Sequence, residues 1–282
     1  MKRILILVTL VAIAGIAGIV RSTANSGDFD RFVSRNASQS VRDDFRQSYQ
    51  LAPGSLVEIS NINGAVKIET SDTQTAEVLI ERTAANQEAL NRRKITVEGG
   101  TNSLQVRGER GEAGFFARLF GSKPSEKITL KLPRQISLRT RGVNGAVTVG
   151  EIDGPIEMRG VNGRVQIAGA KGMAEFKGIN GSLLVGLKEI DVQGLTFSGI
   201  NGNIELQLAP GVNADLETHG MNGRIVSDMS DVSIDKNRHG KYSARIGNGG
   251  SAITANGING NIRLTRTGAS AAVTSADLAD KD

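Results

Sequence analysis

The sequence predicts an all-β protein: a right-handed parallel β-solenoid whose coils take about 18–21 residues each and turn at Asn-Gly corners. Three observations predict it: an Asn-Gly pair that recurs in similar surroundings, glycines that recur every nine residues, and apolar residues that alternate with polar ones between them. An antiparallel β-meander or sandwich is the alternative, because Asn-Gly is also a strong hairpin signal.

The Asn-Gly pairs mark the expected corners, since Asn and Gly tolerate the positive φ that a sharp turn needs. From Asn144 onward the successive asparagines are 18, 18, 21, 21 and 37 residues apart. Such a repeat is typical of solenoids, because one coil cannot bury its apolar face alone. The last gap is close to two periods, which predicts one degenerate unit inside it. The predicted structural turns are Asn63-Gly64, Asn144-Gly145, Asn162-Gly163, Asn180-Gly181, Asn201-Gly202, Asn222-Gly223 and Asn259-Gly260.

The residues between the corners have the alternation of a strand with one buried face. Counted from each glycine of the nine-residue repeat, the third and fifth positions are apolar and the fourth is polar in most units, as in Val165-Gln166-Ile167. We expect each coil to stack on the one before it. Val147, Val165 and Leu183 would then form one inward column, each about 4.8 Å from the next.

The amino terminus has the layout of an export signal. Lys2 and Arg3 precede an apolar run, Ile4 to Val20, and Ser22-Thr23-Ala24 follows as a small-x-small pattern, which predicts cleavage after Ala24. The alternative is an uncleaved membrane anchor at residues 4–20, which is at the short limit for a membrane span.

The rest of the chain is less regular. Residues 86–93 suggest a short helix, and strands are expected at 56–70 around a turn, 75–83, 94–97, 104–107 and 127–132. The predicted segments are a signal peptide at 1–24, a polar linker or loose helix at 25–50, an irregular β region continuous with the solenoid at 51–135, solenoid repeats at 136–267 and a disordered tail at 268–282.

Composition excludes several classes of function. The net charge is +5, and removing Lys2, Arg3 and Arg21 with the signal leaves +2, so a nucleic-acid partner has little support. There is no cysteine, which excludes disulfides, a thiol nucleophile and thiolate metal sites. Neither His219 nor His239 has metal or triad spacing, so we expect no metal, no cofactor and no catalytic residues.

The outward positions of the repeat are the candidate binding residues, because they vary between coils while the inward positions are used for packing. Glu157 and Glu175 are 18 residues apart, as are Arg159 and Lys177, so both pairs should stack on one outer face with opposite charges side by side. The ligand-binding candidates are Arg159, Arg164 and Lys177. The loop Gly114 to Gly121 holds three phenylalanines and is expected to cap the solenoid or to touch a membrane.

Three stretches carry a resemblance to a known family: "FRQSYQLAPGSLVEISNINGAVKIET", the Gly-Ile-Asn-Gly repeats, and "GSAITANGINGNIRLTR". Over roughly residues 45–267 the chain resembles the bacterial putative-adhesin family of β-strand-repeat proteins, a domain of unknown function related to the head-GIN group. The resemblance implies a secreted or envelope-located β-solenoid, and it supplies no catalytic residues.

These observations together predict an exported, non-enzymatic scaffold, an adhesin or interaction protein of the bacterial cell envelope. Its expected location is the periplasm, the cell surface or the medium, and its expected partner is a polysaccharide or an envelope protein. Membrane contact is expected only if residues 4–20 stay uncleaved or through residues 114–121. The alternatives are a carbohydrate-active enzyme on a β-helix and a membrane-anchored envelope-stress or assembly factor.

Overall fold

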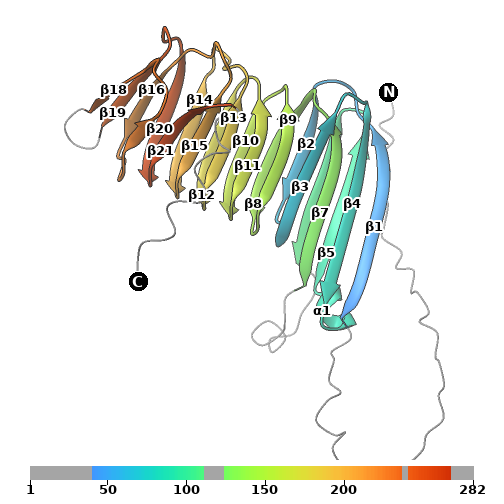
Figure 1. Ribbon diagram of the computed structural model, residues 1–282. Helices are drawn as coiled ribbons and strands as arrows, with labels where there is room; N and C mark the ends of the chain where they lie inside the picture. The colour runs from blue at the N-terminus through green and yellow to red at the C-terminus, as the bar shows by residue number, and fades with distance from the viewer. Residues whose placement is uncertain (1–39, 111–123, 237–240, 268–282) are drawn as a thin grey trace, which may run out of the picture.

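The computed structural model of the chain describes residues 40–110, 124–236 and 241–267. The predicted signal, the 114–121 loop, His239 and the predicted tail lie outside these residues. The described chain is an elongated β-solenoid made of two facing sheets, one of ten strands and one of eleven (Figure 1). The predicted all-β solenoid is confirmed, while its right-handed sense stays a prediction.

The central coils stack in sequence order, one strand in each sheet per coil. Their parallel register aligns Val147 with Val165 and Val165 with Leu183, which confirms the predicted inward column. The strands of these coils are β8 (Ile136–Val143), β9 (Val147–Ile152), β10 (Ile156–Asn162), β11 (Val165–Ala170), β12 (Ala174–Asn180), β13 (Leu183–Leu187), β14 (Leu195–Asn201) and β15 (Ile204–Leu208).

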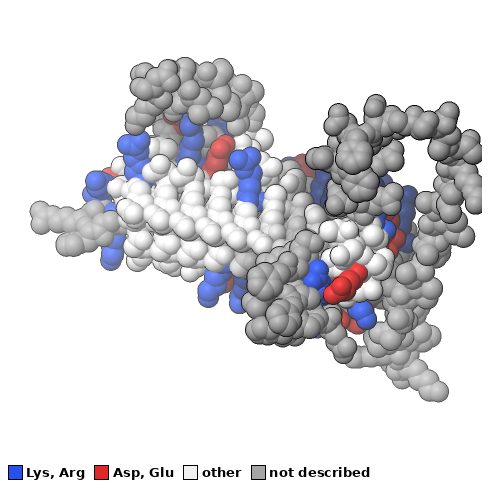
Figure 2. All heavy atoms as spheres, turned by 90° about the horizontal axis from the view of Figure 1, so that it is seen from below, with Lys and Arg blue, Asp and Glu red and all other residues white. Residues whose placement is uncertain are grey.

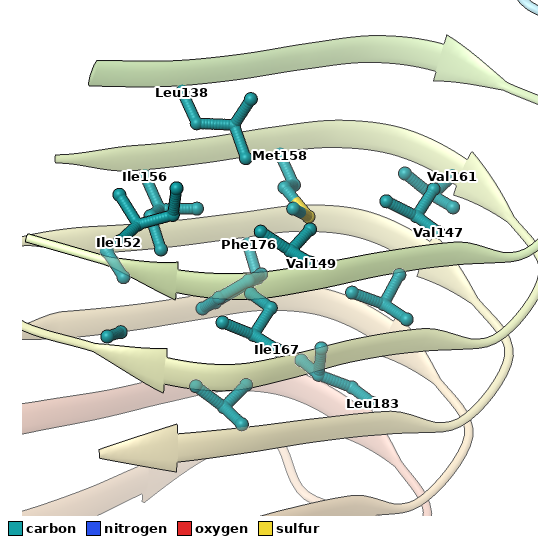
Figure 3. Packing of buried hydrophobic residues seen from close by; sticks show 14 of the residues in the cluster. Leu138, Val147, Val149, Ile152, Ile156, Met158, Val161, Ile167, Phe176 and Leu183 are labelled. Carbon is teal, nitrogen blue, oxygen red and sulfur yellow. The ribbon is translucent and has the colours of Figure 1, made fainter. Parts of the chain in front are cut away.

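The core is a continuous apolar layer between the two sheets (Figure 3). Val165 and Ile167 are fully buried, whereas Gln166 between them faces outward. Phe176 and Phe197 stack on each other with ring centroids 5.3 Å apart. Burial at about 25 cal/mol per Å² makes this layer the main stabilising contribution of the fold.

At the carboxyl-terminal end two coils stand in reversed order. The coil of β20 (Ser251–Asn259) and β21 (Ile262–Arg266) lies between β14–β15 and the coil of β16 (Ala214–His219) and β17 (Ile225–Ser227). The expectation that each coil stacks on the one before it is therefore wrong here.

The length of the gap between Asn222 and Asn259 predicted a degenerate coil inside it, and this prediction is wrong. It holds an antiparallel hairpin, β18 (Val232–Lys236) and β19 (Tyr242–Ile246). The hairpin extends the eleven-stranded sheet past β16, and Val232 and Tyr242 pack against the end of the core. β18 is thus the edge strand of this sheet, and its burial pattern is mostly exposed.

The amino-terminal end shows a second reversal. The coil of β2 (Ser55–Ser60) and β3 (Gly64–Ser71) lies between the coil of β8–β9 and that of β6 (Ser103–Arg110) and β7 (Ser125–Pro133). Antiparallel strands β4 (Thr75–Ala84) and β5 (Arg93–Gly100) flank this outer coil. The predicted helix is α1 (Gln87–Asn91), capped by the side chain of Asn86.

Residues 41–50, expected to belong to a polar linker or loose helix, instead form the edge strand β1 (Val41–Gln50), antiparallel to β4. Polar residues on its inner side concealed the alternation in the sequence. Asp43 on that side is ion-paired to Arg82, and Phe45 and Tyr49 pack against the core.

Candidate functional site

One corner of the solenoid is a continuous ladder of asparagine side chains. From Asn144 onward each Nδ2 donates to the Oδ1 of the asparagine in the adjacent coil at 2.9–3.1 Å. The side-chain amides of successive coils thus bond one another directly. All seven predicted corners take part, in the spatial order Asn63, Asn144, Asn162, Asn180, Asn201, Asn259 and Asn222.

The glycines of each corner serve two different needs. Gly178, two residues before the corner asparagine, has φ +64, and a Cβ there would have its nearest neighbour at 3.8 Å. Gly181, directly after the asparagine, would place a Cβ 2.4 Å from the carbonyl oxygen of Gly163. Backbone conformation alone therefore selects the first glycine, whereas close stacking of the coils, together with a φ of +152, selects the second.

The ladder begins at a buried carboxylate that the sequence analysis missed. The Glu126 side chain is fully buried, accepts the backbone N–H of Asn63 at 2.8 Å and is paired with Arg93 Nε at 2.5 Å. Its position could have been read from β7, because Glu126 is in phase with the inward Ile128 and Leu130. These contacts are structural, since they satisfy the charge within the fold.

The outer face of the eleven-stranded sheet carries the charges in rows that run across the strands. The register of β10 and β12 pairs Glu157 with Glu175 and Arg159 with Lys177, which confirms the predicted stacking. The neighbouring strand β8 extends both rows, because Arg141 pairs with Arg159 and Arg139 with Glu157. One row is therefore Arg141, Arg159 and Lys177, which we call the cation row.

The carboxylates beside the cation row are held by arginines. Glu157 accepts from Arg139 at 2.9 Å and Arg141 at 3.3 Å and lies 2.9 Å from Arg159 Nε, and Arg159 also reaches Glu175 at 2.8 Å. Burial opposes the charge on Glu157, but the hydrogen bonds from Arg139 and Arg141, together with the positive charges of Arg139 and Arg159, outweigh it and lower the pKa of Glu157. The hydrogen bond to Glu175 raises the pKa of Arg159. Ionised at neutral pH, Glu157 is unsuited to donate a proton.

The cations stand further out than the carboxylates. The side chains of Arg141 and Arg159 are 47% and 44% exposed, against 17% for Glu157 and 30% for Glu175. Seen from below, basic side chains project from both margins of the long body and outnumber acidic ones on its outline (Figure 2). A molecule approaching this face therefore meets positive charge first.

The predicted ligand residues separate into two places. Arg159 and Lys177 lie together in the cation row, whereas Arg164 follows the corner glycine Gly163 and is exposed beside the ten-stranded sheet. Arg141 was missed, although its position before Gly-Val-Asn-Gly matches that of Arg159. Among described residues, neither Lys177 nor Arg164 has an ion pair within 4 Å.

A hollow of about 270 Å³ lies at the opposite corner near the amino-terminal end. Arg134 at its edge is 3.4 Å from Asp72 and 3.0 Å from Glu151, so its charge is already compensated. The hydrogen bond from Lys188 lowers the pKa of Glu151. The hollow is lined by Leu51, Pro53, Ser71, Asp72, Thr73, Gln74, Pro133, Arg134 and Gln135.

No group of three or more His, Asp or Glu side chains within the described ranges could hold a metal ion. In the same residues no helix has the length and apolar character needed to cross a membrane.

No protein-family model matches the chain, and no curated protein sequence matches it. Several solved structures are similar to the chain, with low sequence identities and low TM-scores. A "putative cell adhesion protein" from Clostridium sporogenes is 9% identical over 79% of this chain and 100% of that one, with a TM-score of 0.33. A "putative adhesin" from Bacteroides fragilis is 10% identical over 79% and 97%, with a TM-score of 0.28. A "putative lipid binding protein" from Parabacteroides distasonis is 10% identical over 78% and 96%, with a TM-score of 0.24.

Proposed function

We propose that the protein is an exported, non-enzymatic scaffold of the bacterial cell envelope that binds an extended partner across the outer face of its eleven-stranded sheet. The observation that carries this proposal is the register of that face. Side chains of one kind recur on consecutive coils in straight rows, with cations outermost. A partner that also repeats along its length can contact each row several times, and multiple weak contacts add up to useful affinity.

The chemistry of the carboxylates supports binding rather than turnover. A glycosidase needs one carboxyl group that keeps its proton near neutral pH and a second that is ionised. Glu157 has a lowered pKa, and arginines hold both Glu157 and Glu175. The residues that recur in every coil are used for packing and turning, which leaves the outward side chains for recognition.

The test of this function is direct binding of the full chain to isolated envelope polysaccharides, neutral and acidic, and to envelope proteins. We expect saturable binding that is lost when Arg141, Arg159 and Lys177 are all changed to Gln. The control changes Lys67, Arg164 and Arg263, three cations outside the cation row, to Gln and should retain binding. Hydrolysis of a bound polysaccharide that stops on changing Glu157 or Glu175 would instead establish the enzyme alternative.

Export is part of the proposal, and its support is the pattern Ser22-Thr23-Ala24 behind an apolar run. We expect the protein recovered from cells to begin at Asn25. Intact-mass measurement checks this, and a mass that retains Met1 would favour the membrane-anchored alternative.

A further inference from the structure

We infer that the partner is an acidic polysaccharide with one carboxylate on each sugar, and that it lies along the cation row, perpendicular to the strands. This inference rests on the proposed function and names its ligand class. The cation row places one positive charge on each of three consecutive coils, in the register Arg141, Arg159, Lys177.

The spacing of the row suits such a polymer. Neighbouring strands are about 4.8 Å apart, which is close to the length of one pyranose residue in an extended chain. A polyuronate lying along the row therefore advances by about one sugar per coil. Because successive sugars are turned about the chain axis, the long side chains of the row reach its carboxylates from beneath and from the side. A polymer with charges only on every second sugar would meet alternate cations and use fewer of them.

The chemistry of the row suits a carboxylate. Guanidinium groups present five N–H donors in a planar fork that matches a carboxylate with two parallel hydrogen bonds. Arg141 uses Nη2 toward Glu157, and Arg159 uses Nε and Nη2 toward Glu157 and Glu175, so donors remain on both. The carboxylates beneath thus hold the guanidinium groups in place while their outer edges stay open.

The three carboxylates nearby do not cancel the attraction at the surface. The side chains of Glu58, Glu157 and Glu175 are 18%, 17% and 30% exposed. The side chains of Arg141 and Arg159 are 47% and 44% exposed. Lys177 is exposed and has no ion pair within 4 Å among described residues. An anion above the row is closer to the cations than to the carboxylates, so the Coulomb interaction is attractive.

Uncharged residues flank the three consecutive cations on both sides, which predicts the length of ligand that these cations recognise. On one side Arg141 is aligned with Ser60, a buried serine, and on the other Lys177 is aligned with Ser198. Beyond Ser60 the same register continues to the exposed Arg107 of β6, two strands away from Arg141. The next coil after Ser198 carries Asn256. Three charged sugars therefore fill the row, and a fourth meets a serine on either side, whereas a fifth on the side of Ser60 reaches Arg107.

The experiment titrates the full chain with oligogalacturonates of one to six sugars by calorimetry at low salt. We expect affinity to rise by about tenfold or more from one sugar to three and by less than about twofold from three to four, with a further gain only at five sugars, where the ligand reaches Arg107. The methyl-esterified trisaccharide, which keeps the sugars and removes the charges, should bind at least about tenfold more weakly.

Variants locate the site. Arg159→Gln should weaken trisaccharide binding about tenfold and Lys177→Gln about fivefold. Arg164→Gln removes the same charge outside the row and should change it by less than about twofold. Arg159→Lys keeps the positive charge but lacks the planar guanidinium fork. Its affinity should therefore lie between that of Arg159→Gln and that of the unchanged protein. Unchanged melting temperatures for these exposed substitutions show that the fold is intact.

Each contrary result is distinct. Binding of the esterified and charged trisaccharides with equal affinity, or an effect of Arg164→Gln as large as that of Arg159→Gln, would overturn the inference and leave the scaffold function standing. Affinity that keeps rising in equal steps to six sugars would overturn the three-coil site. Binding to anionic lipid vesicles but not to the oligosaccharides would show that the row recognises a membrane. Failure to bind any polysaccharide or envelope protein would overturn the proposed function itself.

Discussion

The central coils and the two ends of the solenoid are stabilised in different ways. Between β8 and β15 every coil follows the last in sequence order, pairs in parallel and places its charges on the surface. At each end one pair of coils is reversed, and antiparallel strands complete the sheets. The amino-terminal end also has a buried ion pair, Arg93 with Glu126. Repetition thus stabilises the middle of the molecule, whereas particular contacts stabilise its ends.

Asparagine side chains next to the corners link the reversed coils at the carboxyl-terminal end. The side chain of Asn203 accepts the backbone N–H of Asn261 at 2.9 Å, and the side chain of Asn261 accepts that of Arg224 at 3.1 Å. Arg224 itself has no amide to offer the next coil. In the central coils the same position is taken by Arg164 and Ser182, and stacking proceeds there without this acceptor. The two asparagine contacts therefore favour the observed order and are not a requirement of stacking.

The largest expected effect tests the middle of the molecule. Val165→Asp places a lone carboxylate in the fully buried column and should cost more than about 4 kcal/mol, enough to unfold the protein. Gln166→Asp, one residue away on the outer face, should change stability by less than about 1 kcal/mol. Thermal denaturation followed by circular dichroism compares the two, and equal melting temperatures would contradict the assigned faces.

The next effect tests whether the amino-terminal end depends on its particular contacts. Glu126→Gln leaves Arg93 without its charge partner and should cost about 3 kcal/mol. Glu157→Gln, which breaks more exposed ion pairs in the middle, should cost less than about 1 kcal/mol. Urea denaturation measures both. If Glu157→Gln were the more costly change, the contrast between middle and ends would be wrong.

The corners of the central coils allow a sharper test of repetition. Gly181→Ala forces a Cβ against the Gly163 carbonyl and should cost about 3 kcal/mol, while Gly178→Ala strains only the backbone and should cost about 1 kcal/mol. Gly178→Asn should cost less still, because Asn61 occupies the equivalent place with φ 57. Denaturation midpoints rank the three variants, and the reverse order would mean that stacking distance does not limit the corner.

The smallest effect concerns pH. Because the pKa of Glu157 is lowered in the folded protein, its stabilisation is present above its unfolded pKa of about 4.3 and is lost as pH falls through the folded value. Glu157→Gln should therefore flatten the fall in melting temperature between about pH 5 and pH 3. A fall as steep as in the unchanged protein would show that this carboxylate does not contribute.

Much of the candidate surface could be predicted from the sequence. The 18-residue spacing of Glu157 with Glu175 and of Arg159 with Lys177 suffices to align them once the coils are parallel. Two features could not be read in this way. The greater exposure of the cations depends on side-chain packing across β8, β10 and β12. Arg164 is separated from the cation row because the chain passes from the eleven-stranded to the ten-stranded sheet at the corner before it.

The sequence by itself determined the architecture of a coil. The alternation of apolar and polar residues determined which side chains point inward, and the Asn-Gly pairs determined where the chain turns and where the asparagine ladder forms. Only the tertiary structure decided the order of coils, the hairpin β18–β19 and the strand β1. The physical reason is that coils with the same corner and the same inward residues fit beside one another in any order. What selects one order is contacts between residues far apart in the chain, such as Asn261 with Asn203 and Glu126 with Asn63. No local pattern encodes those contacts.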